Sequence, residues 1–453
     1  MNKIFSSFRD PCGYIYEENG KIYRYVAPSY KQDYDKLINS GLYAELIKNN
    51  RLIKTKEITP KNGAYKLLEV EKIDFISYPY EWSFNAYKDA ALLTLKVQKS
   101  ALMHNMTLKD ASAYNVQFHN GNPVFIDTLS FENLDEKAPW AAYKQFCQHF
   151  LAPLSLMSLK DVRLSCLMKQ YIDGIPLDLA SELLPFNIPF GLWLNIRLNA
   201  YFQKKYETSQ TPKNRFQNMS KTKHLALIEG LTQLIKNLKS PTRETTWENY
   251  YDLTNYNKTA FKNKENLLTQ YIKSLKNVKL IADFGANNGY FTNIALKATP
   301  NAKAVAFDID VNAVEKNYME VKKNQKTNLL PLVLDVLNPS PGIGWDNRER
   351  EDLKARADFD VIMALALIHH LSISANIPFD YLASYFANFA PYLIIEFVPK
   401  DDSQVQKLLA SRADIFPWYC EDEFEKAFKK YYTIVQKDKI KGSLRSLYLL
   451  KRK

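Results

Sequence analysis

Three acidic residues in the C-terminal half each end or follow a short apolar run. Asp283 lies near the end of the run Leu280–Phe284, Asp308 follows Ala304–Phe307, and Asp335 follows Leu330–Leu334. Such runs are typical of buried parallel strands, whose carboxyl ends share one edge of a sheet. Asp308 also follows the second loop glycine by 19 residues, where a nucleotide-binding α/β fold presents an acid to ribose hydroxyls. The spacing predicts three carboxylates around one ligand crevice.

The first of these acids opens a glycine loop that leads into an expected helix, 290–298. Gly285 and Gly289 sit at this strand-to-helix junction, where a tight loop lets a ligand approach backbone N–H groups and the helix N-terminus. The G-x-G-x-x-G pattern of dinucleotide dehydrogenases is absent, which argues against that class. In the alternative interpretation the glycines only form a turn and the acids cap helices, as Asp310 is expected to do.

From about Val278 to the C-terminus, this constellation resembles the class I S-adenosylmethionine-dependent methyltransferases. The resemblance implies S-adenosylmethionine as cofactor, with Asp308 on the ribose hydroxyls and Asp335 at the adenine amino group. It also implies that Asp283, Gly285 and Gly289 shape the pocket for the methionine part, and that Ala286 and Asn287 of the same loop bind the cofactor.

Candidate catalytic residues lie near the ends of the fourth apolar run, 358–371, and of the fifth, Leu393–Phe397. The segment 358–371 ends in His369 and His370, also a feature similar to many small-molecule methyltransferases of this class. A histidine suits the base that a hydroxyl acceptor requires, whereas methyl transfer itself mainly needs alignment in a dry pocket. We favour His370, because it lies deeper toward the following loop, although packing or capping fits each histidine about as well. Glu396 could bind substrate, act as the base, or pair with a nearby lysine.

The C-terminal half has two further features, an aromatic segment before the first strand and a likeness to a narrower group of methyltransferases. The aromatic segment 247–256 and Phe261 precede the first strand, where they could stack on adenine or, as we favour, cover the sheet. The C-terminal half also resembles bacterial nodulation-type methyltransferases, including the run 394–404.

A second constellation lies in the N-terminal half. Asp110 precedes Asn115 by five residues, and a hairpin signal at Asn120-Gly121 then leads to Asp127. This order resembles the catalytic loop and metal-binding aspartate of protein-kinase-like folds. The chain departs from that pattern, since it has no glycine-rich loop near Gly13, no evident strand lysine and no Phe-Gly after Asp127. We therefore favour a degenerate kinase-like domain that binds substrate or a partner, with ordinary turn residues as the equal alternative.

The elements that must position these residues alternate between strands and helices. Five buried runs and two more around Gly442 predict an α/β fold with a doubly wound, seven-stranded, mainly parallel sheet for residues 241–453. An α+β domain, possibly kinase-like, is expected for residues 1–240. It should contain a hairpin at 13–26, a helix at 31–48, strands at 52–58 and 65–70, and a helix at 84–106.

Composition restricts the function further. The 453 residues carry a net charge of +12, and residues 201–300 hold 16 basic against 7 acidic residues. A solvated helical face explains this basic stretch better than a phosphate-binding surface does. An RNA methyltransferase is therefore kept as an alternative to a small-molecule methyltransferase. A second alternative is a protein without catalytic activity, in which the nucleotide-binding fold serves as a scaffold. Four scattered cysteines indicate reduced thiols and no metal site. Without an apolar span or signal core, we expect a cytoplasmic enzyme acting on a small-molecule acceptor, with nucleic acid not favoured and no membrane partner.

Overall fold

The computed structural model describes residues 2–201, 219–241, 258–410 and 413–453. It divides into two compact units. Unit 1 comprises Met1–Arg243 with Gly342–Glu351, and unit 2 comprises Glu244–Pro341 with Asp352–Lys453. The ten residues 342–351 therefore belong to unit 1, although they lie in sequence between two strands of unit 2. The sequence did not indicate that this segment packs with unit 1.

Unit 1 opens with a five-stranded antiparallel sheet in the order β1-β2-β3-β5-β4. These strands span Asn2–Lys3, Gly13–Glu18, Lys21–Val26, Lys66–Val70 and Thr55–Ile58, in that spatial order. Asn19 and Gly20 join β2 to β3 with φ values of 52° and 73°, as a tight hairpin requires. The expected single helix at 31–48 is instead two, α1 (Lys31–Asn39) and α2 (Leu42–Lys48), because Gly41 has a left-handed φ of 83°.

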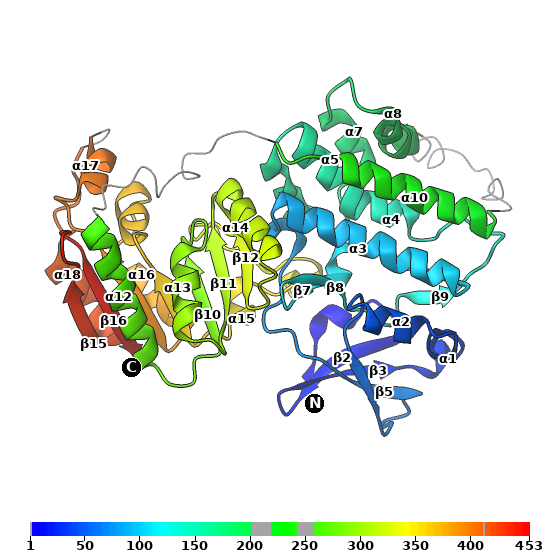
Figure 1. Cartoon of the computed structure of the whole chain (residues 1–453), viewed down its shortest axis with the longest axis horizontal. Helices are drawn as coiled ribbons and strands as arrows, with labels where there is room; N and C mark the ends of the chain where they lie inside the picture. The colour runs from blue at the N-terminus through cyan, green and yellow to red at the C-terminus, as the bar shows by residue number, and fades with distance from the viewer. Residues whose placement is uncertain (1, 202–218, 242–257, 411–412) are drawn as a thin grey trace. The chain divides into compact units, whose positions relative to one another are not determined.

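The rest of unit 1 is mainly helical. Helix α3 (Phe84–Met103) ends three residues before the expected end, and Met106 instead begins a short strand. In Figure 1, α3 lies alongside α10 (Lys221–Asn237). Two short antiparallel pairs are β6 (Met106–Leu108) with β9 (Phe131–Asn133) and β7 (Val116–His119) with β8 (Asn122–Phe125). The remaining helices are α4 (Tyr143–Phe146), α5 (Ala152–Leu159), α6 (Leu167–Gln170), α7 (Leu177–Leu183) and α8 (Phe190–Leu192).

Unit 2 is a Rossmann-like α/β fold with a seven-stranded sheet in the order β12-β11-β10-β13-β14-β16-β15. The sheet is mixed, since β16 runs antiparallel to both of its neighbours while the first five strands pair in parallel. The strands are β10 (Leu280–Phe284), β11 (Lys303–Asp308), β12 (Leu329–Val333), β13 (Val361–Ala364), β14 (Tyr392–Phe397), β15 (Tyr432–Lys439) and β16 (Ser446–Arg452).

Helices cover the sheet on both faces, as Figure 1 shows with α12 and α13 on one side and α16 and α18 on the other. The helices are α12 (Lys258–Ser274), α13 (Tyr290–Ala298), α14 (Val311–Lys323), α15 (Leu353–Arg356), α16 (Phe379–Ala387), α17 (Ser403–Leu409) and α18 (Glu421–Tyr431). Strand β10 pairs with both β11 and β13, so the chain order reverses there and opens a crevice at the carboxyl ends.

Within the described ranges, no helix combines the length and the apolar character needed to cross a membrane.

Candidate functional site

The loop between β10 and α13 is built from residues in the left-handed conformation. Gly285 and Gly289 have φ values of 76° and 77°, and Asn287 between them has a φ of 50°. The backbone N–H groups of Gly285 and Ala286 both donate to the Phe307 carbonyl of β11 at 2.9 Å, which holds the loop against the neighbouring strand. This geometry explains why glycine stands at two of these positions.

Asp283 lies at the end of β10 beneath this loop. Its side chain is 2% exposed and accepts a hydrogen bond from the Thr292 hydroxyl of α13 at 2.6 Å. Burial is the main cause that raises the pKa of Asp283 to about 7, against opposing contributions from Thr292 and the charge of Lys264. The carboxyl is therefore poised to ionise near neutral pH when a cationic group lies beside it.

Asp308 ends β11 and is tied to the same loop. Its two carboxylate oxygens accept hydrogen bonds from the backbone N–H of Asn287 at 2.7 Å and of Asp310 at 2.8 Å. Burial again dominates and raises the pKa of Asp308 to about 6, while these hydrogen bonds act in the opposite direction. Asp310 itself caps α14 by accepting from the N–H groups of Asn312 and Ala313, as expected.

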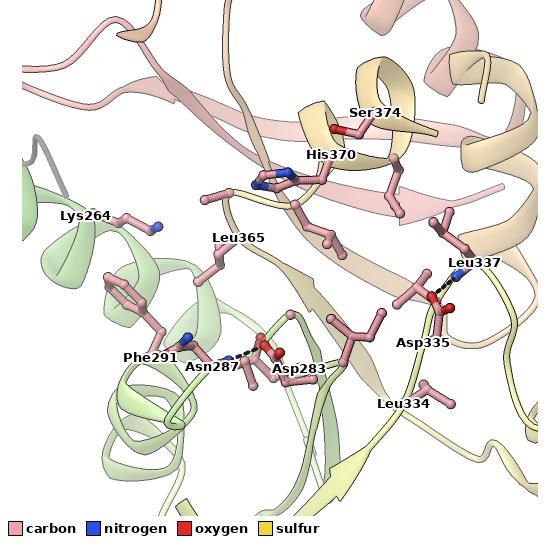
Figure 2. A pocket seen from close by; sticks show the side chains of 18 of the residues that line it. Lys264, Asp283, Asn287, Phe291, Leu334, Asp335, Leu337, Leu365, His370 and Ser374 are labelled. Carbon is pink, nitrogen blue, oxygen red and sulfur yellow. Dashed lines mark hydrogen bonds between the residues drawn. The ribbon is translucent and has the colours of Figure 1, made fainter. Parts of the chain in front are cut away.

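These carboxylates line one pocket of about 250 Å³ at the carboxyl ends of the strands. Asp335 joins them from the loop after β12, where it accepts the N–H of Leu337 at 2.8 Å. In Figure 2, Lys264 and Asp335 lie toward opposite ends of the pocket, and Asp283 and Asn287 lie between them. The walls are mostly apolar and include Phe261, Phe291, Ile309, Val336, Leu337, Leu365 and Leu367.

The two histidines differ in their surroundings. They lie in a helical turn beyond β13, which ends at Ala364, so they are not at the strand end that the sequence suggested. His370 begins the π-helical turn His370–Ser374 and lines the pocket, and burial lowers its pKa to about 4. His369 is fully buried behind it, and neither of its ring nitrogens has a hydrogen-bond partner among the described residues.

Glu396, on β14, is locked in a buried ion-pair network. Its two oxygens contact Lys264 Nζ at 2.6 Å and Arg445 Nη1 at 3.2 Å, and none of these side chains is more than 5% exposed. Arg445 also binds Asp402 through Nε at 2.8 Å. The pairing with a nearby lysine, one of the roles considered for Glu396, is thus the one that the geometry displays.

Sequence reasoning missed Lys264, which it grouped with an exposed basic stretch. Lys264 lies on the buried face of α12 with Ala260, Leu268 and Ile272, and its ammonium sits 4.3 Å from the centre of the Phe291 ring. A lysine in an apolar i, i+4, i+8 stripe was the available signal. Other members of the stretch (Lys204, Lys205, Lys213 and Arg215), like the aromatic segment 247–256, lie outside the described residues.

The predicted N-terminal residues Asp110, Asn115 and Asp127 lie close together in unit 1. Asn115 donates to Ser130 at 3.3 Å, and the Ser130 hydroxyl donates to Asp127. Burial raises the pKa of Asp110, and the Asn115 side chain acts to lower it. Sequence reasoning missed Arg24 of β3, whose Nη1 lies 2.5 Å from Asp127 Oδ1. No pattern in the sequence distinguishes this arginine, because its partner is about a hundred residues away.

The chain was compared with protein families and with solved structures. No protein-family profile matches it. Solved structures aligned with part of it include the N-methyltransferase NodS from Bradyrhizobium japonicum WM9, at 14% identity, covering 43% of this chain and 98% of that one, with a TM-score of 0.31. A SAM-dependent methyltransferase from Aquifex aeolicus aligns at 15% identity over 46% of this chain and 100% of that one, with a TM-score of 0.33.

A relative by sequence extends over both units. Nodulation protein NoeA of Rhizobium meliloti (strain 1021) is 33% identical over 463 aligned residues, which cover 99% of this chain and 96% of that protein. This relative confirms the likeness to nodulation-type proteins that the C-terminal half suggested. The chain belongs to the family of the nodulation protein NoeA.

Proposed function

We propose that this protein transfers a methyl group from S-adenosylmethionine to an acceptor. The observation that carries the proposal is the pocket itself, in which carboxylates from the ends of β10, β11 and β12 converge beside a left-handed glycine loop. The cofactor supplies an electrophilic methyl on a sulfonium. The protein then mainly has to bind the cofactor and the acceptor, orient them toward each other and exclude water from the pocket. Mostly apolar walls suit this task.

Each end of the pocket has groups that match one end of the cofactor. Lys264 offers a positive charge to the methionine carboxylate, and Asp283 offers a carboxylate to the ammonium. We assign the ribose hydroxyls to Asp308, which lines the same pocket. At the far end, Asp335 can accept from the adenine amino group while the exposed side chains of Ile309 and Leu337 cover the ring faces.

For the base we favour His370, because it lines the pocket and its low pKa keeps the imidazole neutral at pH 7. A neutral imidazole can take the proton that a hydroxyl acceptor loses. Glu396 is a weaker candidate, since both of its oxygens are engaged by cations, and we assign it to holding Lys264 in place. His369, buried behind His370, we assign to packing.

The acceptor we propose is a hydroxyl of a sugar-containing or other small metabolite, recognised with the help of the degenerate kinase-like unit 1. Incubation with radiolabelled S-adenosylmethionine and separate pools of oligosaccharides, small metabolites and total tRNA tests this. Label in the first two pools supports the proposal. Label confined to tRNA, with binding that weakens steeply as salt rises, would establish the RNA alternative instead.

Replacing Asp308 with alanine is expected to weaken S-adenosylmethionine binding by about 1 to 3 kcal/mol, the range for hydrogen bonds to a charged group. This corresponds to roughly 5- to 150-fold in Kd, measurable by isothermal titration calorimetry. The matched control is Asp380→Ala, because Asp380 pairs with Lys430 at 2.8 Å and does not line the pocket. Unchanged affinity in a folded Asp308→Ala protein would remove Asp308 from the ribose site.

Cofactor affinity is expected to rise with pH between about 5.5 and 7.5. Binding needs ionised Asp283 and Asp308, whose pKa values burial raises to about 7 and about 6, so at low pH each must first lose a proton. Below both pKa values the loss approaches about tenfold per pH unit for each carboxyl. Titration calorimetry across this range, with Asp283→Asn as comparison, measures the slope. A flat wild-type profile, or one that Asp283→Asn leaves unchanged, contradicts the assignment.

A further inference from the structure

A second charged centre, the aspartate cluster of Arg24, Asp110, Asn115, Asp127 and Ser130, lies in unit 1 and contributes no residue to the lining of the proposed cofactor pocket. Its core is a buried ion pair. Arg24 Nη1 lies 2.5 Å from Asp127 Oδ1, and the two side chains are 8% and 15% exposed. Arg24 also donates through Nη2 to the Ile126 carbonyl at 3.3 Å, which fixes the guanidinium next to the carboxylate.

Both carboxylates accept hydrogen bonds from groups of the same chain. Asp127 Oδ1 accepts from Arg24 and from the Leu129 N–H at 3.2 Å, and its Oδ2 accepts from the Ser130 hydroxyl. Asp110 accepts from the Ser112 N–H at 2.9 Å, and the side chains of Asn115 and Gln145 act to lower its pKa against the larger effect of burial. Each oxygen of Asp127 therefore has at least one protein donor.

A kinase-like centre would use the same positions for Mg²⁺, which the asparagine and the second aspartate hold together. These residues do not fit that ion. Mg²⁺ requires near-octahedral oxygen ligands at about 2.0 to 2.1 Å, and it would have to displace a guanidinium that stays protonated in proteins. In the part of the chain that the structure describes, no group of three His, Cys, Asp or Glu side chains is arranged to hold a metal ion.

We infer that Arg24 is a built-in cation that takes the place of the divalent ion, so that unit 1 keeps the aspartate cluster without binding a magnesium nucleotide. A buried carboxylate needs a positive partner, and a covalently attached guanidinium supplies it without a metal. The cluster then serves to hold the loops that contain Asp110 and Asp127 together, and phosphoryl transfer is not an activity of this unit.

Binding of Mn²⁺ and of Mg-ATP to the full-length protein tests this inference. The concentration of free Mn²⁺ is measured from its electron paramagnetic resonance signal, and binding of Mg-ATP is measured by isothermal titration calorimetry. The wild-type protein is expected to bind neither below about 1 mM, roughly the range that separates specific sites from weak surface binding. Arg24→Met removes the cation and leaves the carboxylates, so it should bind Mn²⁺ at least about tenfold more tightly than wild type and unfold at lower temperature.

Two controls separate the cause from a general loss of structure. Arg163→Met removes a guanidinium from the exposed Arg163–Asp161 pair and should change neither Mn²⁺ binding nor the Tm. The double variant Arg24→Met/Asp127→Asn removes both charges, so it should fold better than Arg24→Met and bind no Mn²⁺.

Wild-type protein that binds Mn²⁺ or Mg-ATP at micromolar concentration, and loses this binding in Asp127→Asn, overturns the inference. So does a folded Arg24→Met protein that binds Mn²⁺ no better than wild type. If Arg24→Met does not fold, the wild-type and Asp127→Asn titrations decide the question alone. None of these outcomes depends on methyl transfer, so the two proposals fail separately.

Discussion

Replacing Glu396 with alanine is expected to lower the free energy of unfolding by about 3 to 5 kcal/mol, the cost of removing one partner from a buried ion pair. Glu396 is fully buried, and its loss takes from Lys264 the carboxylate at 2.6 Å and from Arg445 the carboxylate at 3.2 Å, although Arg445 keeps its pair with Asp402. Urea denaturation followed by circular dichroism measures the change. An exposed control is Glu423→Ala, whose partner Lys426 lies at 3.2 Å in solvent and which should cost less than about 1 kcal/mol.

A variant in which both charged residues are replaced by apolar ones provides a second test of the same ion pair. The double variant Lys264→Met/Glu396→Leu removes the pair instead of breaking it, so it should recover most of the stability lost in Glu396→Ala. Its affinity for S-adenosylmethionine should be lower than that of the wild-type protein, because Lys264 lines the pocket and offers the charge proposed to bind the methionine carboxylate. A loss below about 1 kcal/mol in Glu396→Ala, or a double variant no more stable than Glu396→Ala, would show that the network does not hold the fold as described.

Replacing Gly285 with valine is expected to weaken S-adenosylmethionine binding by about 100-fold or more. At a φ of 76° a β-branched residue is strained by roughly 1 to 2 kcal/mol. Its Cβ would also lie 3.3 Å from Leu367 Cδ1, so the extra methyl groups would push into the pocket wall or into the ligand. The strained loop is expected to leave its left-handed conformation in the free protein, so binding must restore that conformation, and each 1.4 kcal/mol of this cost is a factor of ten in Kd.

The control for this substitution is Gly230→Val, in helix α10 of unit 1. A Cβ added at Gly230 meets no atom within 4 Å, and the position is far in sequence from the glycine loop. Calorimetric titration of both variants, after thermal unfolding has shown that each is folded, compares them directly. Retained cofactor affinity in a folded Gly285→Val protein contradicts the placement of the loop beside the ligand.

The parts of the fold that were predictable from sequence depend on local patterns. The apolar run Leu280–Phe284 is strand β10 and the segment Tyr290–Ala298 is helix α13, because buried runs and helical spacing are properties of consecutive residues. Asp283, Asp308 and Asp335 follow from the same logic, since parallel strands bring their carboxyl ends to one edge. Gly41 was overlooked as a break between α1 and α2 because the apolar spacing continues across it.

What could not be predicted depends on contacts between distant residues. Lys264 and Glu396 are 132 residues apart, so the apolar stripe around Lys264 can indicate its burial but cannot identify its partner. Arg24 and Asp127 are a similar case in unit 1. The segment Gly342–Glu351 joins unit 1 through contacts such as the bidentate pair of Arg9 with the buried Glu349, at 2.5 and 2.8 Å. Its sequence gives no sign of that attachment.

The most direct test of the proposed function is isothermal titration of the purified full-length protein with S-adenosylmethionine at pH 7.5. We expect one site per chain with a Kd in the micromolar range, about 5- to 150-fold weaker in Asp308→Ala and unchanged in Asp380→Ala. Absence of binding by folded wild-type protein, or binding that Asp308→Ala and Gly285→Val leave unchanged, would contradict the assignment of this pocket to the cofactor.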